Sequence, residues 1–282
     1  MRISALAALP GALARQAPRL ASGIFAEAGW LTAHVLMYPL GLRPESLEKL
    51  ARHDLDGLTP EQRGMVHHGV DAANTPILLV HGIVDNHSIF TVMDRTLRRR
   101  GFQTVSSYDY GVLTRDVRAA SEALGDAIEK VAANTGYEQI HVIGHSLGGL
   151  IARYYVQRLG GDAFVHTLVT LGSPHHGTTL ARAAPFLPLV RQLTPGSGVI
   201  RELAEPAPDC RTRFIAFHSD LDHLVVPHRN ARLEHPDLNV RNVAVRGVGH
   251  MSMPHNGGIA FQIASALREL DPNGTAVPSD AD

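Results

Sequence analysis

Short apolar runs recur along the middle of the chain, separated by longer segments of mixed polarity. The clearest runs lie at residues 77–80, 140–143, 167–171 and 213–218. Runs of this length without polar alternation are typical of strands that are buried on both faces of a sheet. Weaker patterns predict further strands at residues 103–107 and 239–246.

Segments with helical spacing separate these runs. Their apolar side chains recur every three or four positions, as one face of an amphipathic helix requires. The predicted helices lie at residues 89–100, 116–134, 150–159 and 261–270. Asn86 or Ser88 is expected to cap the first helix, and Gly101 ends it. Because each parallel pair of strands needs a crossover, this order predicts an α/β fold with a mostly parallel central sheet and helices on both faces.

A single serine lies among glycines where the strand at residues 140–143 gives way to a helix. The sequence Gly144-His145-Ser146-Leu147-Gly148 fits the G-x-S-x-G nucleophile elbow, in which small residues let strand and helix approach closely around a strained backbone. Such a turn exposes the Ser146 hydroxyl at the carboxyl edge of the sheet, where the N–H groups of the next helix also point. A turn without chemistry is the alternative, but the flanking strand and helix favour a catalytic serine.

Residues 142–149, Val-Ile-Gly-His-Ser-Leu-Gly-Gly, resemble the nucleophile region of α/β-hydrolase lipases, in particular bacterial lipases and esterases. The resemblance extends from about residue 75 to residue 263. It implies the α/β-hydrolase fold, with a helical lid insertion at about residues 179–210. That segment is rich in apolar residues and punctuated by prolines, and its hydrophobicity argues against disorder.

The resemblance also implies a catalytic triad. Asp222 begins an Asp-x-x-Val-x-Pro pattern after a predicted strand, and His250 closes Gly-Val-Gly-His after the next one. With Ser146 as nucleophile, His250 is then the base and Asp222 the acid that orients it, in the chain order that α/β-hydrolases use. Asp220 is the alternative acid and His255 the alternative base.

Main-chain groups are expected to form the oxyanion hole. His81-Gly82 matches the family's oxyanion loop, so the resemblance implies the backbone N–H groups of Ile83 and Leu147 as donors. Residues 172–178 resemble the Gly-Ser-Pro-His-x-Gly segment of bacterial lipases. We interpret them as a loop that shapes the pocket and assign neither His175 nor His176 to catalysis.

Composition narrows the classes of function. The 282 residues carry 26 basic and 27 acidic side chains, which gives no electrostatic argument for binding nucleic acid. Cys210 is the single cysteine, so no intramolecular disulfide can form. The 17 histidines occur without an H-E-x-x-H pattern or a cysteine partner. We therefore expect no metal site, and the triad that the resemblance implies needs no organic cofactor.

The predicted organisation is an N-terminal helical extension at residues 1–73, a catalytic domain at residues 74–271 and a flexible tail at residues 272–282. Residues 21–42 are predicted to form an amphipathic helix rather than a membrane span, because charges and a proline interrupt the apolar run. This helix packs on the domain or rests on a membrane surface. The expected location is the cytoplasm or a membrane surface, and the sequence leaves secretion open.

Within this resemblance the expected function is hydrolysis of carboxylic esters such as acylglycerol lipids, through an acyl-enzyme intermediate. An acyltransferase, thioesterase or polyester depolymerase with the same triad is the alternative. A lipid-binding protein without turnover is a third, which the intact set Ser146, Asp222 and His250 argues against. The expected partner is a lipid or acyl-ester substrate, and residues 21–42 or the lid are the candidates for contact with a lipid interface.

Overall fold

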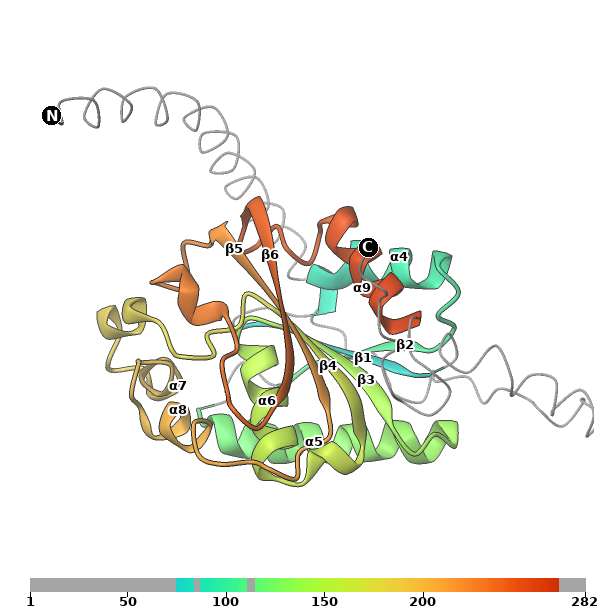
Figure 1. Ribbon diagram of the computed structural model, residues 1–282, viewed down its shortest axis with the longest axis horizontal. Helices are drawn as coiled ribbons and strands as arrows, with labels where there is room; N and C mark the ends of the chain where they lie inside the picture. The colour runs from blue at the N-terminus through green and yellow to red at the C-terminus, as the bar shows by residue number, and fades with distance from the viewer. Residues whose placement is uncertain (1–74, 84–86, 111–114, 269–282) are drawn as a thin grey trace, which may run out of the picture.

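The computed structural model describes residues 75–83, 87–110 and 115–268. In this part of the chain a sheet of six parallel strands is arranged in the order β2-β1-β3-β4-β5-β6 (Figure 1). The strands are β1 (Ile77–Val80), β2 (Val105–Tyr108), β3 (Ile140–His145), β4 (Val165–Leu171), β5 (Arg213–Leu221) and β6 (Asn239–Gly249). The predicted parallel α/β architecture is confirmed.

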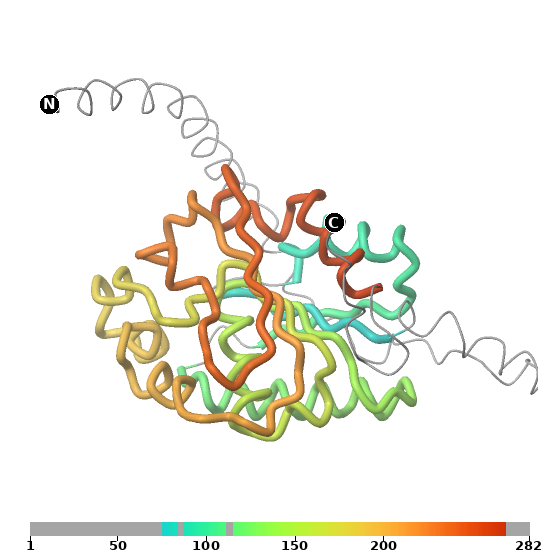
Figure 2. The backbone as a smooth tube through the Cα atoms, in the orientation of Figure 1, coloured from blue at the N-terminus to red at the C-terminus, as the bar shows by residue number. Residues whose placement is uncertain are grey.

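Helices cover both faces of the sheet. The long ones are α4 (Thr91–Arg99), α5 (Val117–Thr135), α6 (Leu147–Arg158) and α9 (Gly257–Arg268). Figures 1 and 2 show α5 and α6 on one side of the sheet and α4 and α9 on the other. Each face has its own core of buried side chains, which the strands separate.

Strand β1 shows why the sequences of the central strands are unbroken apolar runs. Leu78 and Val80 pack into the core beneath α5 and α6, whereas Ile77 and Leu79 pack into the core beneath α4 and α9. All four side chains are almost completely buried. Because both faces are covered, neither alternate set of side chains meets water.

The strands end together at one edge of the sheet. Val80 of β1 is in register with Tyr108 of β2 and with Gly144 of β3. Farther along the same edge, Leu171 of β4 pairs with His145 of β3 and with Phe217 of β5. The segments that follow these strands are therefore brought side by side, although they are far apart in the sequence.

The start of α4 differs from the prediction. The 3-10 helix η4 (His87–Phe90) precedes it, and Phe90 occupies the N-cap position without a side-chain hydrogen bond. Ser88 is therefore not the cap: its carbonyl oxygen accepts a hydrogen bond from Thr91 Oγ1 at 2.7 Å. Asn86, the other predicted cap, lies outside the described residues. The 3-10 turn satisfies the backbone N–H groups at the start of α4 locally, so no side-chain cap is needed.

Several boundaries also differ from those predicted. Strand β6 continues to Gly249 because it stays paired with β5 as far as Leu221. Helix α9 begins at Gly257, earlier than expected, and the Asn256 side chain accepts a hydrogen bond from the N–H of Ile259 at 3.0 Å. This contact supplies the N-terminal capping that the apolar pattern alone does not reveal.

The predicted N-terminal extension, its amphipathic helix at residues 21–42 and the tail at residues 272–282 lie outside the described residues and stay predictions. Within the described ranges, no helix is long and apolar enough to cross a membrane.

The insertion between β4 and β5 contains three short helical segments, η6 (Thr179–Ala183), α7 (Pro188–Gln192) and α8 (Gly198–Glu202). Its inward side chains join the core beneath α5 and α6: Leu189, Leu193, Val199, Ile200 and Leu203. The segment is therefore packed on the domain, with Leu203 fully buried. That it acts as a lid stays a prediction.

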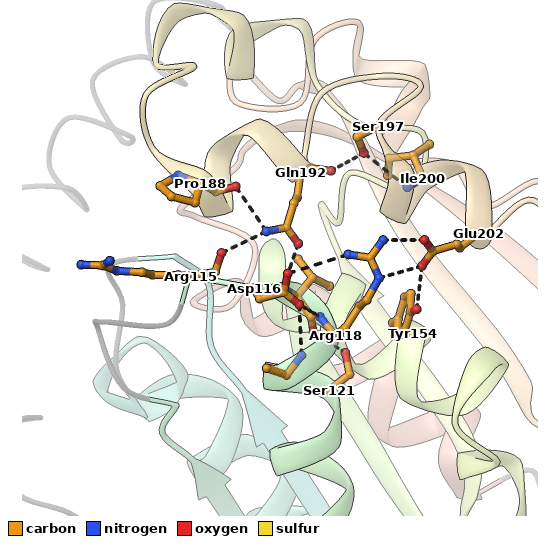
Figure 3. A network of polar contacts seen from close by, with 12 residues as sticks. Arg115, Asp116, Arg118, Ser121, Tyr154, Pro188, Gln192, Ser197, Ile200 and Glu202 are labelled. Carbon is orange, nitrogen blue, oxygen red and sulfur yellow. Dashed lines mark hydrogen bonds and ion pairs between the residues drawn. The ribbon is translucent and has the colours of Figure 1, made fainter.

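Polar contacts fix the same insertion to the two helices beneath it (Figure 3). The Arg118 guanidinium of α5 donates to both carboxylate oxygens of Glu202, and the Tyr154 hydroxyl of α6 donates to the same carboxylate at 2.6 Å. Gln192 accepts from the N–H of Val117 at 3.0 Å and donates to the carbonyl of Arg115 at 2.9 Å. Helices α7 and α8 are thus tied to the start of α5.

Candidate active site

Ser146 lies at the junction of β3 and α6, and its backbone dihedral angles are ones that residues other than glycine rarely adopt. Its φ of 52° and ψ of −121° make it the only non-glycine residue with positive φ in the described part of the chain. Such strain, about 1–3 kcal/mol per residue, persists only where the surroundings enforce it. The predicted sharp turn between strand and helix is confirmed.

The neighbouring glycines allow this turn. A Cβ added to Gly144 would lie 2.4 Å from the Cα of Gly149, and one added to Gly148 would lie 2.2 Å from the carbonyl oxygen of His81. Real side-chain carbons do not come so close to backbone atoms, so only glycine fits at either position. The first turn of α6 is therefore pressed against the ends of β3 and β1.

His250 and Asp222 form a buried pair at the same edge of the sheet. Asp222 follows β5 and His250 follows β6, and the distance from His250 Nδ1 to Asp222 Oδ2 is 2.8 Å. The other carboxylate oxygen accepts hydrogen bonds from the N–H groups of Leu224 at 2.9 Å and Val225 at 2.8 Å. Both oxygens of Asp222 are thus held in fixed positions.

The pKa of Asp222 reflects two opposing effects. Burial by itself raises this pKa, since it disfavours the carboxylate. The charge of the His250 imidazole and its hydrogen bond, together with the two backbone N–H donors, outweigh the burial and bring the pKa below its ordinary value. The carboxylate is therefore ionised at neutral pH, and its charge faces the imidazole.

Backbone contacts bring Ser146 to this pair. The N–H of Ser146 donates to the carbonyl of Leu171 at 2.9 Å, and a Cβ added to the next residue, Gly172, would lie 3.0 Å from both Asp222 Oδ2 and His250 Nδ1. The His145 ring lies 4.8 Å from the His250 ring, centroid to centroid, and His145 Nε2 donates to the His250 carbonyl at 3.2 Å. The backbone on both sides of Ser146 is therefore close to the pair, and the role of the three residues as a triad stays a prediction.

The two alternatives that the sequence left open lie elsewhere. Asp220 is exposed, and its carboxylate accepts a hydrogen bond from the N–H of Gly247 at 2.9 Å. It stabilises the turn of β6 rather than an imidazole. His255 belongs to the turn before α9, where its N–H donates to the carbonyl of Ser252 at 3.2 Å. The pair that the structure forms is Asp222 with His250.

The predicted oxyanion donors follow β1 and β3. Ile83 comes two residues after His81, whose carbonyl oxygen accepts a hydrogen bond from the Tyr110 hydroxyl at 2.9 Å. Leu147 is the first residue of α6 and is fully buried. N–H groups in the first turn of a helix lack intrahelical acceptors. Both backbone segments lie at the carboxyl edge, and their role as oxyanion donors stays a prediction.

His175 has a structural environment. It is buried, and its Nε2 lies 2.9 Å from Thr170 Oγ1. Burial, reinforced by the nearby charge of Arg153, lowers its pKa well below the ordinary value, so the ring is neutral. Arg153 in turn donates to the His175 carbonyl at 3.2 Å. These contacts hold the loop at residues 172–178 in place and agree with leaving His175 out of the chemistry.

Sequence reasoning missed the polar cluster beside the oxyanion loop. Asp109 follows β2 and contacts His81 and His87, which lie before and after Ile83 in the sequence. The one available signal was positional, because a carboxylate directly after β2 falls next to the end of β1 only once the parallel register is known. In the described ranges no group of three or more His, Cys, Asp or Glu residues is arranged to hold a metal ion.

Exposed apolar side chains flank the loop that carries Asp222. Leu224 and Val226 belong to this loop, and Phe186, with 77% of its surface exposed, belongs to the insertion beside it. Hydrogen bonds from Thr179 N to the Val226 carbonyl at 2.8 Å and from Thr178 Oγ1 to the Leu224 carbonyl at 2.8 Å join the two segments. Leu224 and Val226 thus expose apolar side chains within four residues of Asp222.

The sheet is parallel, a strained serine turn follows β3, and an aspartate and a histidine follow the last two strands. This arrangement is that of the α/β-hydrolase class. A family model described as palmitoyl protein thioesterase matches residues 76–206. Triacylglycerol lipases of Pseudarthrobacter phenanthrenivorans and Burkholderia plantarii are each 29% identical over 117 residues, which is 39% of this chain and 36% or 32% of theirs. The chain thus spans about a third of the length of these curated relatives.

Solved structures agree on the fold. A lipase of Bacillus licheniformis in its mature form superposes with a TM-score of 0.58 at 18% identity, covering 70% of this chain and 92% of that one. Lipase B of Aspergillus fumigatus gives a TM-score of 0.62 at 19% identity, covering 73% and 55%. The chain therefore has the α/β-hydrolase fold of these lipases, and part of its sequence is similar to lipases and to the thioesterase family model.

Proposed function

We propose that the protein is a carboxylic ester hydrolase of lipase or esterase type, with Ser146, His250 and Asp222 as its catalytic triad. One observation carries this proposal. The Asp222–His250 pair, joined at 2.8 Å, is buried at the same sheet edge as the strained Ser146. An ionised carboxylate, an imidazole and a serine in this arrangement are the parts that acyl transfer needs.

The chemistry begins with proton transfer to the imidazole. Asp222 accepts the hydrogen bond of the His250 Nδ1–H group, which leaves Nε2 as the basic nitrogen. His250 then removes the Ser146 proton while the serine oxygen attacks the carbonyl carbon of the ester. The resulting imidazolium is stabilised by the Asp222 carboxylate, whose own position is fixed by the N–H groups of Leu224 and Val225.

Attack converts the ester carbonyl oxygen to an oxyanion. The backbone N–H groups of Ile83 and Leu147 are its proposed donors, since they belong to the two segments that end β1 and begin α6. Loss of one such donor typically raises the barrier by about 3–4 kcal/mol. The close contact of Gly148 with the His81 carbonyl supports this assignment, because it fixes the two segments relative to each other.

Three proton transfers through His250 complete the turnover. His250 gives its proton to the leaving alcohol as the carbon–oxygen bond breaks, and the acyl group stays on Ser146 as an ester. A water molecule then attacks the acyl-enzyme while His250 accepts a proton from it. As the second tetrahedral intermediate collapses, the bond to the Ser146 oxygen breaks, His250 returns its proton to that oxygen, and the carboxylic acid is released.

The proposed substrates are acyl esters with an apolar chain, such as acylglycerol lipids. The exposed apolar side chains of Leu224 and Val226, in the loop that carries Asp222, favour an apolar group. The names of the curated relatives, triacylglycerol lipases, point to the same class of substrate. Contact with a lipid interface through residues 21–42 or the insertion at residues 179–210 belongs to this proposal.

Hydrolysis of acyl thioesters is the second candidate, and the match to the palmitoyl protein thioesterase model favours it. The same triad and oxyanion donors serve, with a thiol in place of an alcohol as the leaving group. Parallel assays with triacylglycerol, p-nitrophenyl esters and acyl-coenzyme A of equal chain length separate the two. A kcat/KM at least tenfold higher for the oxygen esters would support the lipase or esterase assignment, and the reverse order would replace it.

The proposal is tested by Ser146→Ala, with Ser265→Ala in α9 as the matched control. Loss of the nucleophile is expected to lower kcat for a p-nitrophenyl ester by about 10⁴-fold or more. The control removes a hydroxyl from a helix outside the site and should leave kcat unchanged. Full ester hydrolysis by Ser146→Ala would overturn the proposed triad.

A further inference from the structure

One carboxylate, that of Asp109, contacts residues on both sides of Ile83 in the sequence. Asp109 Oδ1 accepts a hydrogen bond from the N–H of His87 at 2.9 Å, and Asp109 Oδ2 lies 2.7 Å from His87 Nδ1. The same carboxylate lies 3.4 Å from His81 Nε2. We call these contacts to His81 and His87 the Asp109 bridge.

The bridge follows from the register of the sheet. Val80 at the end of β1 pairs with Tyr108 at the end of β2, so the next residues, His81 and Asp109, are adjacent. The His81 side chain is only 3% exposed, whereas that of Asp109 is 27% exposed. The Asp109 carboxylate thus lies partly exposed at the carboxyl edge of the sheet and contacts a buried imidazole. The hydrogen bonds of this carboxylate go to His87, and hydrogen bonds to a charged acceptor are stronger than neutral ones.

Tyr110 holds the same loop from another side. Its ring stacks on the His81 ring with centroids 4.3 Å apart and planes inclined by 16°. Its hydroxyl donates to the His81 carbonyl oxygen at 2.9 Å. Two consecutive residues after β2 therefore fix the ring and the carbonyl of the residue that precedes the oxyanion loop.

The His81 carbonyl is also the contact point with α6. A Cβ on Gly148 would come within 2.2 Å of this oxygen, so the backbone of Gly148 lies directly against it. Leu147, the other proposed oxyanion donor, precedes Gly148. His81, two residues before Ile83, is therefore in direct contact with the residue that follows Leu147.

We propose that Asp109 is a positioning residue for the oxyanion hole, acting through His81 and His87 on the loop that carries Ile83. This inference rests on the proposed function, because it assigns a task to Asp109 in the same reaction. A donor must meet the oxyanion that forms during attack rather than the carbonyl oxygen of the bound ester. Loosening the bridge should therefore weaken binding of the transition state and leave binding of the substrate nearly unchanged.

Kinetics of Asp109→Ala test the inference, with Asp94→Ala as the matched control. Asp94 pairs with Arg98 at 2.9 Å on the surface of α4 and has no part in the site. For Asp109→Ala we expect kcat on a p-nitrophenyl ester to fall about 10–100-fold with KM changed less than about threefold, a loss smaller than that of a whole donor. A trifluoromethyl ketone, which forms a tetrahedral adduct with serine, should lose affinity by a similar factor. Asp94→Ala should match the wild type in all three quantities.

Asp109→Asn is a more conservative substitution that is measured beside Asp109→Ala. The amide oxygen can still accept from the His87 N–H, but the charge is gone, so its kcat should lie between the wild type and Asp109→Ala. An unchanged kcat in Asp109→Ala would overturn the positioning role, as would a rise in KM that accounts for the whole loss. Either result would leave the chemistry of Ser146 standing.

Backbone exchange gives a readout that does not depend on activity. Hydrogen–deuterium exchange in the peptide covering residues 77–90 should be faster in Asp109→Ala than in the wild type and in Asp94→Ala, with residues 139–159 unchanged. Equal exchange in all three proteins would overturn the bridge itself. If the wild type showed no Ser146-dependent hydrolysis, the proposed function would fail, and the exchange result would still decide whether Asp109 fixes the loop.

Discussion

At the scale of single residues, the site depends on where charge is placed in a buried environment. Asp222 keeps its carboxylate ionised because His250 and two backbone N–H groups face it. Elsewhere in the core, histidines are held neutral. His141 in β3 is completely buried next to His166 and Arg213, and burial first, then these neighbours, lower its pKa to about 3.

Replacing Asp222 with Asn should nearly abolish turnover. The amide preserves the shape of the side chain but cannot stabilise the imidazolium, and its NH₂ group favours the wrong tautomer of His250. We expect kcat for a p-nitrophenyl ester to fall by about 10³–10⁴-fold. Steady-state kinetics check this, with Asp220→Asn as a control that should retain most of the activity. Comparable losses in both variants would contradict the assignment of the acid.

Buried His141 should make folding sensitive to acid. Its pKa in the folded protein, about 3, is lower than the ordinary 6.5 of the unfolded chain, so between these values the unfolded state binds more protons. The free energy of unfolding should therefore fall as the pH drops below 6.5, by up to about 1.4 kcal/mol per pH unit from this group.

Urea unfolding at pH 8 and pH 5 measures this effect. His141→Leu should lose less stability between the two pH values than the wild type, whereas His228→Leu, at an exposed position, should behave as the wild type does. If His141→Leu and the wild type lost the same amount, burial of His141 would not be the cause.

At the scale of elements, backbone contacts between β1, β3 and α6 create the serine turn, and apolar packing holds the insertion. Arg118 and Glu202 are 37% and 31% exposed, so water weakens their attraction. Leu203 at the end of α8 is fully buried in the core beneath α5 and α6. Burial of Leu203 should therefore contribute more to fixing the insertion than the ion pair does.

Two truncations compare these contributions. Leu203→Ala should lower the free energy of unfolding by about 2–5 kcal/mol, because it removes buried methyl groups and leaves a cavity. Arg118→Ala should lower it by about 1 kcal/mol or less, as exposed ion pairs do. Chemical denaturation of both variants checks the order. A larger loss for Arg118→Ala would show that the polar network of Figure 3 dominates.

Adding a methyl group to Gly148 should disturb the turn. Its Cβ would overlap the carbonyls of Val80 and His81, so α6 must move away from β1. We expect a loss of about 1–3 kcal/mol in the free energy of unfolding and a loss of ester hydrolysis. Gly257→Ala is the control, since no atom lies within 4 Å of its added Cβ. Retention of full activity in Gly148→Ala would contradict the close contact.

At the scale of the whole molecule, the parallel sheet and the serine turn were predictable because their signals are local. Strand β1 is apolar on both faces, and the turn around Ser146 needs glycines at fixed spacing. The start of α4 was not predictable, because a 3-10 turn replaces the side-chain cap that Ser88 suggested. Asp109 was missed for another reason: its partners His81 and His87 are brought to it by the register of β1 and β2, which no local pattern encodes.

Covalent labelling tests the central claim most directly. A fluorophosphonate reacts with a serine only where a base removes its proton and donors receive the developing charge. Mass spectrometry of the peptide covering residues 139–159 should show one adduct, on Ser146, in the wild type and almost none in His250→Ala. An unlabelled Ser146 in the folded wild-type protein, or labelling that is as fast without His250 as with it, would contradict the account.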